Sequence, residues 1–117
     1  MHELSVCNAL LQQVEKIAAE HGARKVTRIE LGVGPLSGIE PKLLRNAYPI
    51  AVAGTVAEHA ELVITDFEIR VSCTECNAET PATPNRLLCG ECGGFRTRVI
   101  SGDEMILQRV ELDEIQA

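Results

Sequence analysis

The chain has 117 residues, of which 45% are hydrophobic and only 3% aromatic, so any core it builds must be aliphatic. Seventeen acidic against eleven basic residues give a formal net charge of −6, which argues against a protein that binds phosphate backbones through basic patches. No apolar run approaches the ~20 residues that cross a bilayer, and no export signal is recognisable. We therefore expect a small cytoplasmic protein with no nucleic-acid or membrane partner, whose cysteines are reduced or metal-bound.

The chain begins with a helical pattern that we expect to run over residues 4–21. Its apolar residues recur at helical spacing and form one stripe: Leu4, Cys7, Leu11, Val14 and Ala18. The pattern ends at His21-Gly22, which is typical of a helix C-terminus because glycine readily takes the left-handed cap.

A strand over residues 26–33 and a second helix from Pro41 are predicted next. The strand stops at Gly34-Pro35, a strong turn signal. Proline suits the first turn of a helix. Within the same helix Pro49 predicts an early end or a kink, because proline fits poorly in a helix interior.

The second half contains three further strand-like segments and a stretch rich in cysteine and turn formers. We expect one strand over residues 61–72, a short strand in the segment FRTRVIS and a last strand over residues 105–112. The segment CTECNAETPATPNRLLCGECGG lies between the first two of these strands and is poor in apolar residues. It cannot build a core of its own by burial alone.

This order of elements indicates an α+β fold with two helices on one face of a three-stranded sheet. The last strand must return to that sheet, because alone it could not bury its apolar side. The cysteine-rich stretch is then an inserted four-cysteine zinc-ribbon module of residues 70–102, and the main domain comprises residues 1–69 plus 103–117. The strand order is left open at this stage.

Two CxxC pairs, Cys73 with Cys76 and Cys89 with Cys92, are separated by twelve residues. In a loop-rich stretch of a reduced protein, this pattern predicts one zinc ion held by four thiolates at about 2.3 Å. Four thiolates fill the tetrahedron, so the site would be structural rather than hydrolytic, and the metal would supply folding energy. Gly93 is expected to point its backbone amide at a thiolate.

Iron in a rubredoxin-like site is the main alternative for the four cysteines, although only Phe95 lies near enough to form part of an aromatic shell. Metal-free thiols, a disulfide or a thioredoxin-like redox pair are weaker interpretations, because the second CxxC pair would have no explanation. The fifth cysteine, Cys7, lies on the apolar stripe and is expected to pack as a small hydrophobe. His21 and His59 are expected at the surface.

The first three residues, Met1, His2 and Glu3, form a second candidate metal site. Methionine should be retained before a bulky histidine, which leaves an α-amine with a reference pKa of about 8. That amine, the backbone nitrogen of His2 and one ring nitrogen of His2 can chelate an ion in one plane, a geometry suited to Ni(II) or Cu(II). A solvated histidine and a glutamate that favours the helix dipole would explain the same residues without a metal.

Five segments taken in order resemble the HypA/HybF family of nickel metallochaperones: MHELSV, LGVGPLSGIEPKLL, GTVAEHAELVI, the CxxC…CxxC module and SGDEMILQRVEL. The likeness covers essentially the whole chain. It implies a nickel-binding α/β domain with an inserted zinc ribbon. The implied nickel site is Met1, His2 and Glu3, with the ring of His2 as the essential donor, and the implied zinc site is the four cysteines.

The resemblance also implies a function in metal transfer rather than catalysis. Such a protein binds Ni(II) as cargo at its N-terminus, acts with a HypB-type GTPase and delivers the ion to the precursor of the [NiFe]-hydrogenase large subunit. Some members also serve urease, which makes urease maturation proteins further partners. Certain archaeal members add a ribbon histidine to the nickel site, but this chain has no histidine after His59.

Other functions fit the residues less well. A zinc-ribbon nucleic-acid module conflicts with the acidic balance and the scarcity of aromatic residues. A small redox protein would require iron at the four cysteines. An enzyme is not indicated, because the chain shows no Ser/His/Asp set, no phosphate loop and no open metal site.

Overall fold

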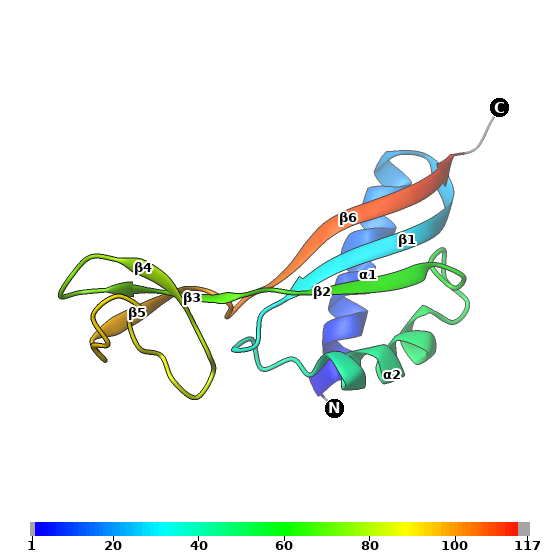
Figure 1. The fold of residues 1–117 in the computed structure, drawn as a ribbon. Coiled ribbons are helices and arrows are strands. Elements are labelled where there is room, and N and C mark those ends of the chain that lie inside the picture. The colour runs from blue at the N-terminus through cyan, green and yellow to red at the C-terminus, as the bar shows by residue number, and fades with distance from the viewer. Residues whose placement is uncertain (1, 115–117) are drawn as a thin grey trace.

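The computed structural model describes residues 2–114, which form two lobes joined by a narrow crossing (Figure 1). The principal extents of 59 × 30 × 17 Å reflect this elongated shape. Along the described residues the elements are α1 (His2–Glu20), β1 (Ala23–Val33), α2 (Pro41–Val52), β2 (Glu61–Asp66), β3 (Ile69–Cys73), β4 (Glu79–Ala82), β5 (Thr97–Ser101) and β6 (Met105–Glu114).

The larger lobe is built on a three-stranded sheet in the order β2-β1-β6. β1 pairs parallel with β2 and antiparallel with β6. A parallel pair needs a long crossover connection, and here the segment containing α2 provides it. The return of the last strand to the first is therefore confirmed, and the strand order that the sequence left open is now known.

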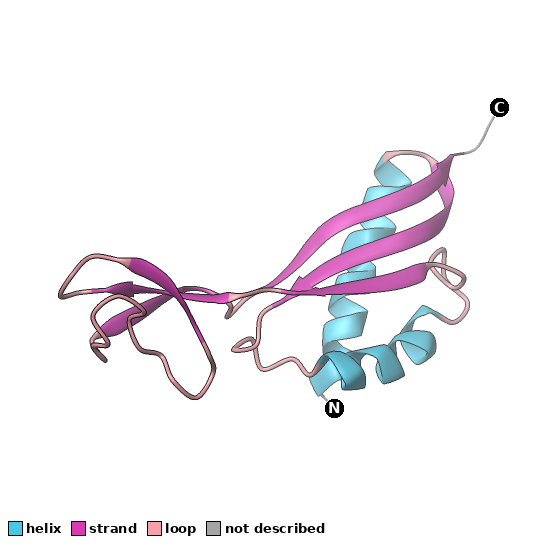
Figure 2. Cartoon of the chain, viewed as in Figure 1, coloured by secondary structure: helices cyan, strands magenta, loops and turns pink. Residues whose placement is uncertain are grey.

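The aliphatic core lies between this sheet and the helices (Figure 2). α1 runs along one face of the sheet, and its predicted stripe is buried from Cys7 to Ala18. β1 occupies the centre of the sheet and buries Val26, Ile29 and Leu31 completely. A central strand that is covered by helices is expected to be this apolar, so the two-helix, three-stranded α+β arrangement is confirmed.

Of the two outcomes expected at Pro49, an early end or a kink, the early end is wrong, because α2 continues to Val52. Proline cannot donate to the carbonyl of Arg45, but both residues are exposed and water can satisfy that carbonyl. The opposite face of the helix is anchored in the core through Tyr48, whose hydroxyl donates to the carbonyl of Ala60 at 3.2 Å. Packing on one face thus maintains the last turn despite the missing hydrogen bond.

The single strand expected over residues 61–72 is also wrong, because the structure divides it between two sheets. β2 ends at Asp66 and β3 begins at Ile69 in the smaller lobe. Between them the amide of Phe67 donates to the carbonyl of Val33 at 2.9 Å, and its ring occupies the space in which Gly32 would carry a Cβ. The ring and this hydrogen bond hold the chain where it leaves the first sheet.

The smaller lobe is an antiparallel sheet in the order β4-β3-β5. β5 matches the short strand predicted in FRTRVIS. β4 was not predicted from the sequence, because it contains Pro81 and is only four residues long. Proline cannot donate to a ladder and is tolerated on an edge strand, which is the position that β4 occupies.

The crossing between the lobes is held by the loop after β1. The amides of Gly34 and Leu36 donate to the carbonyls of Glu104 and Gly102, both at 2.8 Å. The amide of Gly102 in turn donates to the Glu104 carboxylate at 2.8 Å. A Cβ on Gly34 would collide with the backbone carbonyl of Gly102, and one on Gly102 would lie 2.8 Å from the Cα of Ile69. Backbone segments from three parts of the chain therefore meet at this crossing without side chains between them.

Replacing Gly34 with alanine should destabilise the protein by about 3 kcal/mol, because the collision is with backbone that cannot turn away. The matched control is Gly38→Ala, where no atom lies within 4 Å of the added Cβ and only the φ of +81° is unfavourable. That control should cost about 1 kcal/mol. Urea denaturation of the zinc-loaded variants measures the free energy of unfolding of each. An equal loss of that free energy in the two variants would contradict the close approach at the crossing.

Candidate metal centres

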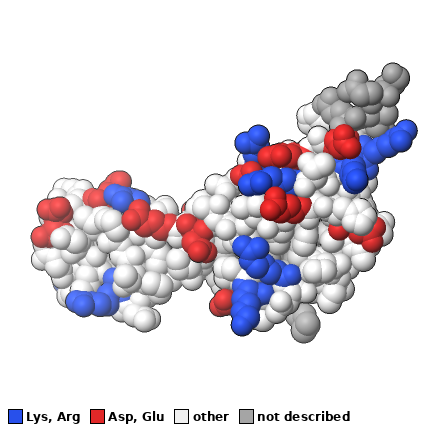
Figure 3. Space-filling model, turned by 45° about the vertical axis from the view of Figure 1, so that its right-hand side comes forward, with Lys and Arg blue, Asp and Glu red and all other residues white. Residues whose placement is uncertain are grey.

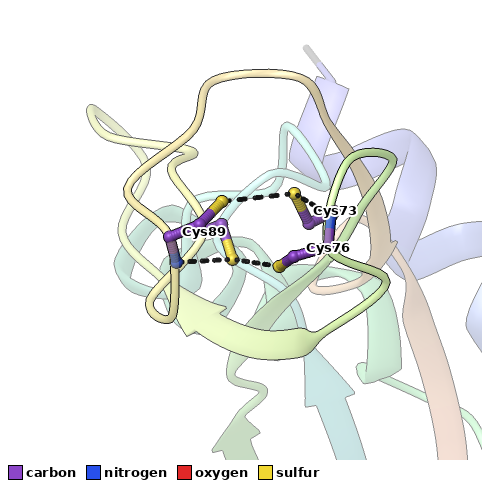
Figure 4. A group of neighbouring side chains, drawn as sticks. Cys73, Cys76 and Cys89 are labelled. Atoms are coloured by element: carbon purple, nitrogen blue, oxygen red, sulfur yellow. Dashed lines mark hydrogen bonds between the residues drawn. The ribbon is translucent and has the colours of Figure 1, made fainter.

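Four cysteine sulfurs converge in the smaller lobe, all within 4.8 Å of one another. Cys73 ends β3 and Cys76 follows in the next turn, whereas Cys89 and Cys92 lie in the loop between β4 and β5. Figure 4 shows the two cysteine turns facing each other across the cluster. The structure therefore brings together all four residues predicted as zinc ligands.

The two CxxC turns, here called the first and second knuckles (residues 73–78 and 89–94), have the same local geometry. In each one, two backbone amides point at the sulfur of the first cysteine, as amides that stabilise a thiolate do. The nitrogen-to-sulfur distances are 3.4 and 3.5 Å from Glu75 and Cys76 to Cys73, and 3.3 and 3.4 Å from Glu91 and Cys92 to Cys89.

The residue after each CxxC closes its knuckle in a left-handed conformation. Asn77 has a φ of 64° and donates to the carbonyl of Cys73 at 3.0 Å, and Gly93 has a φ of 74° and donates to the carbonyl of Cys89 at 2.9 Å. The expectation that the amide of Gly93 points at a thiolate is therefore wrong. The amide of the next residue, Gly94, acts instead to lower the pKa of Cys92, although neighbouring groups, the Cys73 sulfur first, raise that pKa overall.

Sequence reasoning missed three residues that shape the knuckles: Asn77, Gly94 and Thr80. Asparagine is among the residues that most readily adopt a positive φ, so the position of Asn77 directly after the first CxxC was a usable signal. Thr80 had no such signal. Its side chain is buried on β4, and its hydroxyl accepts a hydrogen bond from the amide of Gly90 at 2.8 Å, which joins the second knuckle to the sheet.

The electrostatics of the cluster favour a bound cation. Amides of the second knuckle, that of Cys92 first, lower the pKa of the Cys89 thiol to about 6, and the equivalent amides lower the pKa of Cys73. The Ala78 amide also acts to lower the pKa of Cys76, but neighbouring sulfurs, Cys89 first, raise it to about 12. Four thiolates this close repel one another, and a divalent cation removes that penalty.

The donor set fits zinc better than the alternatives considered from the sequence. Four sulfurs in a tetrahedral arrangement suit zinc or iron. The exposed Phe95, at 76% relative accessibility, does not cover the cluster as the aromatic shell of a rubredoxin-like site would. Instead its ring faces the guanidinium of Arg96 at 5.9 Å.

The predicted nickel ligands lie largely outside the described part of the structure. Nothing is described for Met1 or for the side chain of His2, so the ligand set at the terminus stays a prediction. The backbone of His2 is the first residue of α1, and Glu3 is a half-buried residue in its first turn. The predicted site therefore adjoins the beginning of a helix that is packed against the core.

The remaining cysteine and histidines are placed as the sequence predicts. Cys7 is only 2% exposed, its thiol lies 3.8 Å from the carbonyl of Leu44, and burial raises its pKa. His21 donates from Nδ1 to the carbonyl of Ile17 at 2.9 Å and so caps α1. His59 is exposed, with only a distant approach of 3.9 Å to Glu58.

Among the described residues, neither helix combines the length and apolar character that spanning a membrane requires.

A family model described as "Hydrogenase/urease nickel incorporation, metallochaperone, hypA" matches residues 1–112. The chain belongs to the HypA family. The hydrogenase maturation factor HypA of Nitrosospira multiformis is 47% identical over 112 residues, covering 96% of this chain and 97% of the relative. The corresponding protein of Aquifex aeolicus is 39% identical over 113 residues, covering 97% and 98%.

Solved structures of the family share the fold. The solution structure of the Ni metallochaperone HypA from Helicobacter pylori superimposes with a TM-score of 0.72 at 25% identity, covering 97% of this chain and 98% of that one. A second solution structure of a HypA protein gives a TM-score of 0.73 at 27% identity, covering 96% of each chain. The family, a nickel-incorporation metallochaperone family and not one of enzymes, is thus the one that the sequence segments indicated.

Replacing Cys73 with serine should reduce the zinc content from one ion per chain to nearly none, because the site loses a thiolate and with it the energy that folds the ribbon. Elemental analysis measures the metal, and the amide spectrum shows whether the β3–β5 signals collapse. Cys7→Ser is the matched control. It makes the same change in the core, costs about 1–3 kcal/mol for a buried hydroxyl, and should retain its zinc. Full zinc in the Cys73 variant would contradict the four-sulfur site.

Proposed function

We propose that this protein is a nickel metallochaperone that binds Ni(II) at its N-terminus and delivers it to the precursor of the [NiFe]-hydrogenase large subunit. The observation that carries the proposal is the match of a nickel-incorporation family from residue 1 to residue 112. The Ni metallochaperone HypA from Helicobacter pylori, which shares this fold, supports it. A cytoplasmic location and a HypB-type GTPase partner belong to the same proposal, as do urease maturation proteins.

The proposed nickel ligands are the α-amine of Met1, the backbone nitrogen of His2 and a ring nitrogen of His2, with Glu3 contributing to the site. The helix begins at His2. The first amides of a helix have no intrahelical acceptor, so the nitrogens of His2 and Glu3 can serve a metal without disrupting α1. Nitrogen ligands in one plane suit Ni(II), and the position left for a further ligand allows the ion to be passed on.

The proposed zinc site is the four-sulfur cluster of Cys73, Cys76, Cys89 and Cys92, with a structural role. All four coordination positions are occupied by protein, so no position is open for a water or a substrate. We further propose that residues 1–69 with 103–117 form the nickel-binding domain and that residues 70–102 form the zinc domain. We propose no catalytic role for either site.

Selectivity for nickel cannot come from the terminal ligands alone. By the Irving–Williams order, Cu(II) would bind such a nitrogen site more tightly than Ni(II). The metal that the protein carries must therefore be set by which ion is available and by the partner that supplies or accepts it.

Adding a few residues before Met1 should abolish nickel binding while leaving zinc in place. The extension keeps the ring of His2 but removes the neighbouring free amine, which is one of the three proposed nitrogen donors. Calorimetry with NiCl₂, alongside zinc analysis of the same sample, measures both sites. Nickel binding that survives the extension unchanged would refute the terminal site and, with it, the proposed mode of transfer.

Nickel affinity should fall as the pH is lowered from 7.5 to 6. The α-amine has a reference pKa of about 8 and must lose its proton to bind, as must a backbone amide, so protons compete more strongly at lower pH. Calorimetric titrations at the two pH values test this. An affinity that does not change would mean that the ligands carry no proton to release.

A further inference from the structure

Each knuckle of the smaller lobe presents one sulfur to solvent and keeps the other inside. The first cysteines, Cys73 and Cys89, are 1% and 3% exposed, whereas the second cysteines, Cys76 and Cys92, are exposed residues. Oxidants attack the thiolates that solvent can reach. Two of the four predicted zinc ligands are therefore accessible to a small reagent.

Two contacts between sulfurs run from one knuckle to the other (Figure 4). The Sγ atoms of Cys76 and Cys89 are 3.5 Å apart, and those of Cys73 and Cys92 are 3.7 Å apart. Each contact thus joins an exposed sulfur to a buried one. Sulfurs in a disulfide are about 2.05 Å apart, so a movement of roughly 1.5 Å would close either bond.

The surroundings of the two buried sulfurs favour bonds between the knuckles over bonds within them. Two amides of the same knuckle donate to Cys73, and two donate to Cys89, at distances between 3.3 and 3.5 Å. These amides occupy the side of each sulfur that faces its own turn, so the open side faces the other knuckle. Bonds across the cluster also join cysteines 19 and 13 positions apart, and longer loops restrict the unfolded chain more.

The charge around the exposed sulfurs selects the kind of oxidant. Each CxxC carries an exposed glutamate before its second cysteine, Glu75 in the first and Glu91 in the second. Arg96 lies 3.5 Å from Glu75, whereas Glu91 forms no ion pair within residues 2–114. Figure 3 shows acidic side chains at the outer end and along the upper side of the smaller lobe. Like charges slow the approach of an anionic reagent, but they do not repel a neutral hydroperoxide.

We propose that the ribbon is a redox switch in which a hydroperoxide joins Cys76 to Cys89 and Cys73 to Cys92 and so expels the metal. This inference concerns the ribbon alone and does not depend on the terminal nickel ligands. With its four thiolates converted into two disulfides, the site has no charge left with which to hold a divalent ion.

Each disulfide forms in two steps that consume one molecule of peroxide. The exposed thiolate, for example that of Cys76, attacks one peroxide oxygen, the O–O bond breaks, and the departing hydroxide takes up a proton to become water. The buried thiolate opposite, here Cys89, then attacks the sulfenic sulfur, the S–O bond breaks, and a second hydroxide leaves as water after taking up a proton. Two electrons pass from the pair of sulfurs to the peroxide.

The test follows zinc and the sites of crosslinking together. Trypsin cuts after arginine, which places the two knuckles on separate peptides, residues 71–86 and 87–96. The zinc-loaded full chain is treated with millimolar hydrogen peroxide, and a chromogenic indicator measures the zinc released. We expect zinc release to accompany a covalently linked pair of these peptides, in which fragmentation locates the two proposed bonds. Retained zinc, or unlinked peptides that each contain their own disulfide or sulfonic acids, would overturn the proposal.

Reversal and the remaining cysteine provide the controls. Dithiothreitol with ZnCl₂ should cleave the linked pair and restore the zinc content, because disulfides are reducible and sulfonic acids are not. Zinc that cannot be restored would contradict a switch. The variant Cys7→Ser, which changes the buried thiol of the larger lobe, should release zinc at the same rate and give the same linked peptides. A requirement for Cys7 would refute the proposed pairing.

A second oxidant tests the role of charge. Oxidised glutathione, an anionic disulfide, should release zinc at least about tenfold more slowly than hydrogen peroxide at the same concentration. The double variant Glu75→Gln/Glu91→Gln should reduce this difference, whereas its matched control Glu68→Gln/Glu79→Gln, at exposed residues of the same half of the chain, should leave it unchanged. Equal rates for the two oxidants, or equal effects of the two double variants, would refute the selection of a neutral hydroperoxide.

Discussion

The pairing of β6 with β1 is the constraint on which the rest of the structure depends. It completes the sheet beneath α1, and it requires the chain between β2 and β6 to leave that sheet and return to it. The cost of closing such a loop grows only slowly with its length, but the two ends must still be brought together. Here the inserted sheet does this itself, because Arg70 pairs with Ser101 and Gly102 packs against Ile69. An insertion whose ends are already adjacent leaves the larger lobe nearly undisturbed.

The two lobes are stabilised by different physics. The larger lobe buries a continuous aliphatic cluster between its sheet and its helices, and burial of this kind contributes roughly 25 cal/mol for each Å² of apolar surface. The smaller lobe buries far less, with Ile69 and Val71 as its main buried aliphatic residues. Its two knuckles are arranged around four sulfurs, so a bound metal would supply the stability that the missing core cannot. The stability of the smaller lobe can therefore depend on a metal while that of the larger lobe does not, although both belong to one chain.

The sequence alone predicted the features that depend on a local pattern of residues. The stripe on α1, the CxxC pairs and the strands β1, β5 and β6 follow from periodicity or spacing, and these features appear as predicted. The sequence did not predict the features that depend on tertiary packing. Nothing local shows that Phe67 lies against Gly32 and ends β2, or that the core holds α2 together beyond Pro49. Strand order is likewise a property of contacts between distant segments. The terminal nickel ligands were identified by chemistry and resemblance, and their geometry lies outside the described residues.

The two candidate metal sites differ in how easily each could release its ion. A zinc ion in the ribbon would be enclosed by two knuckles whose amides are directed at its ligands, so losing it would mean losing the fold of the lobe. Of the residues proposed to form the nickel site, His2 (through its backbone) and Glu3 belong to the first turn of α1, where amides have no helical partner. The fully buried part of the stripe begins only at Cys7. Binding or losing nickel there would leave the core intact. A transferable ion at a helix terminus and a permanent ion in a closed ribbon are thus consistent with one stable scaffold.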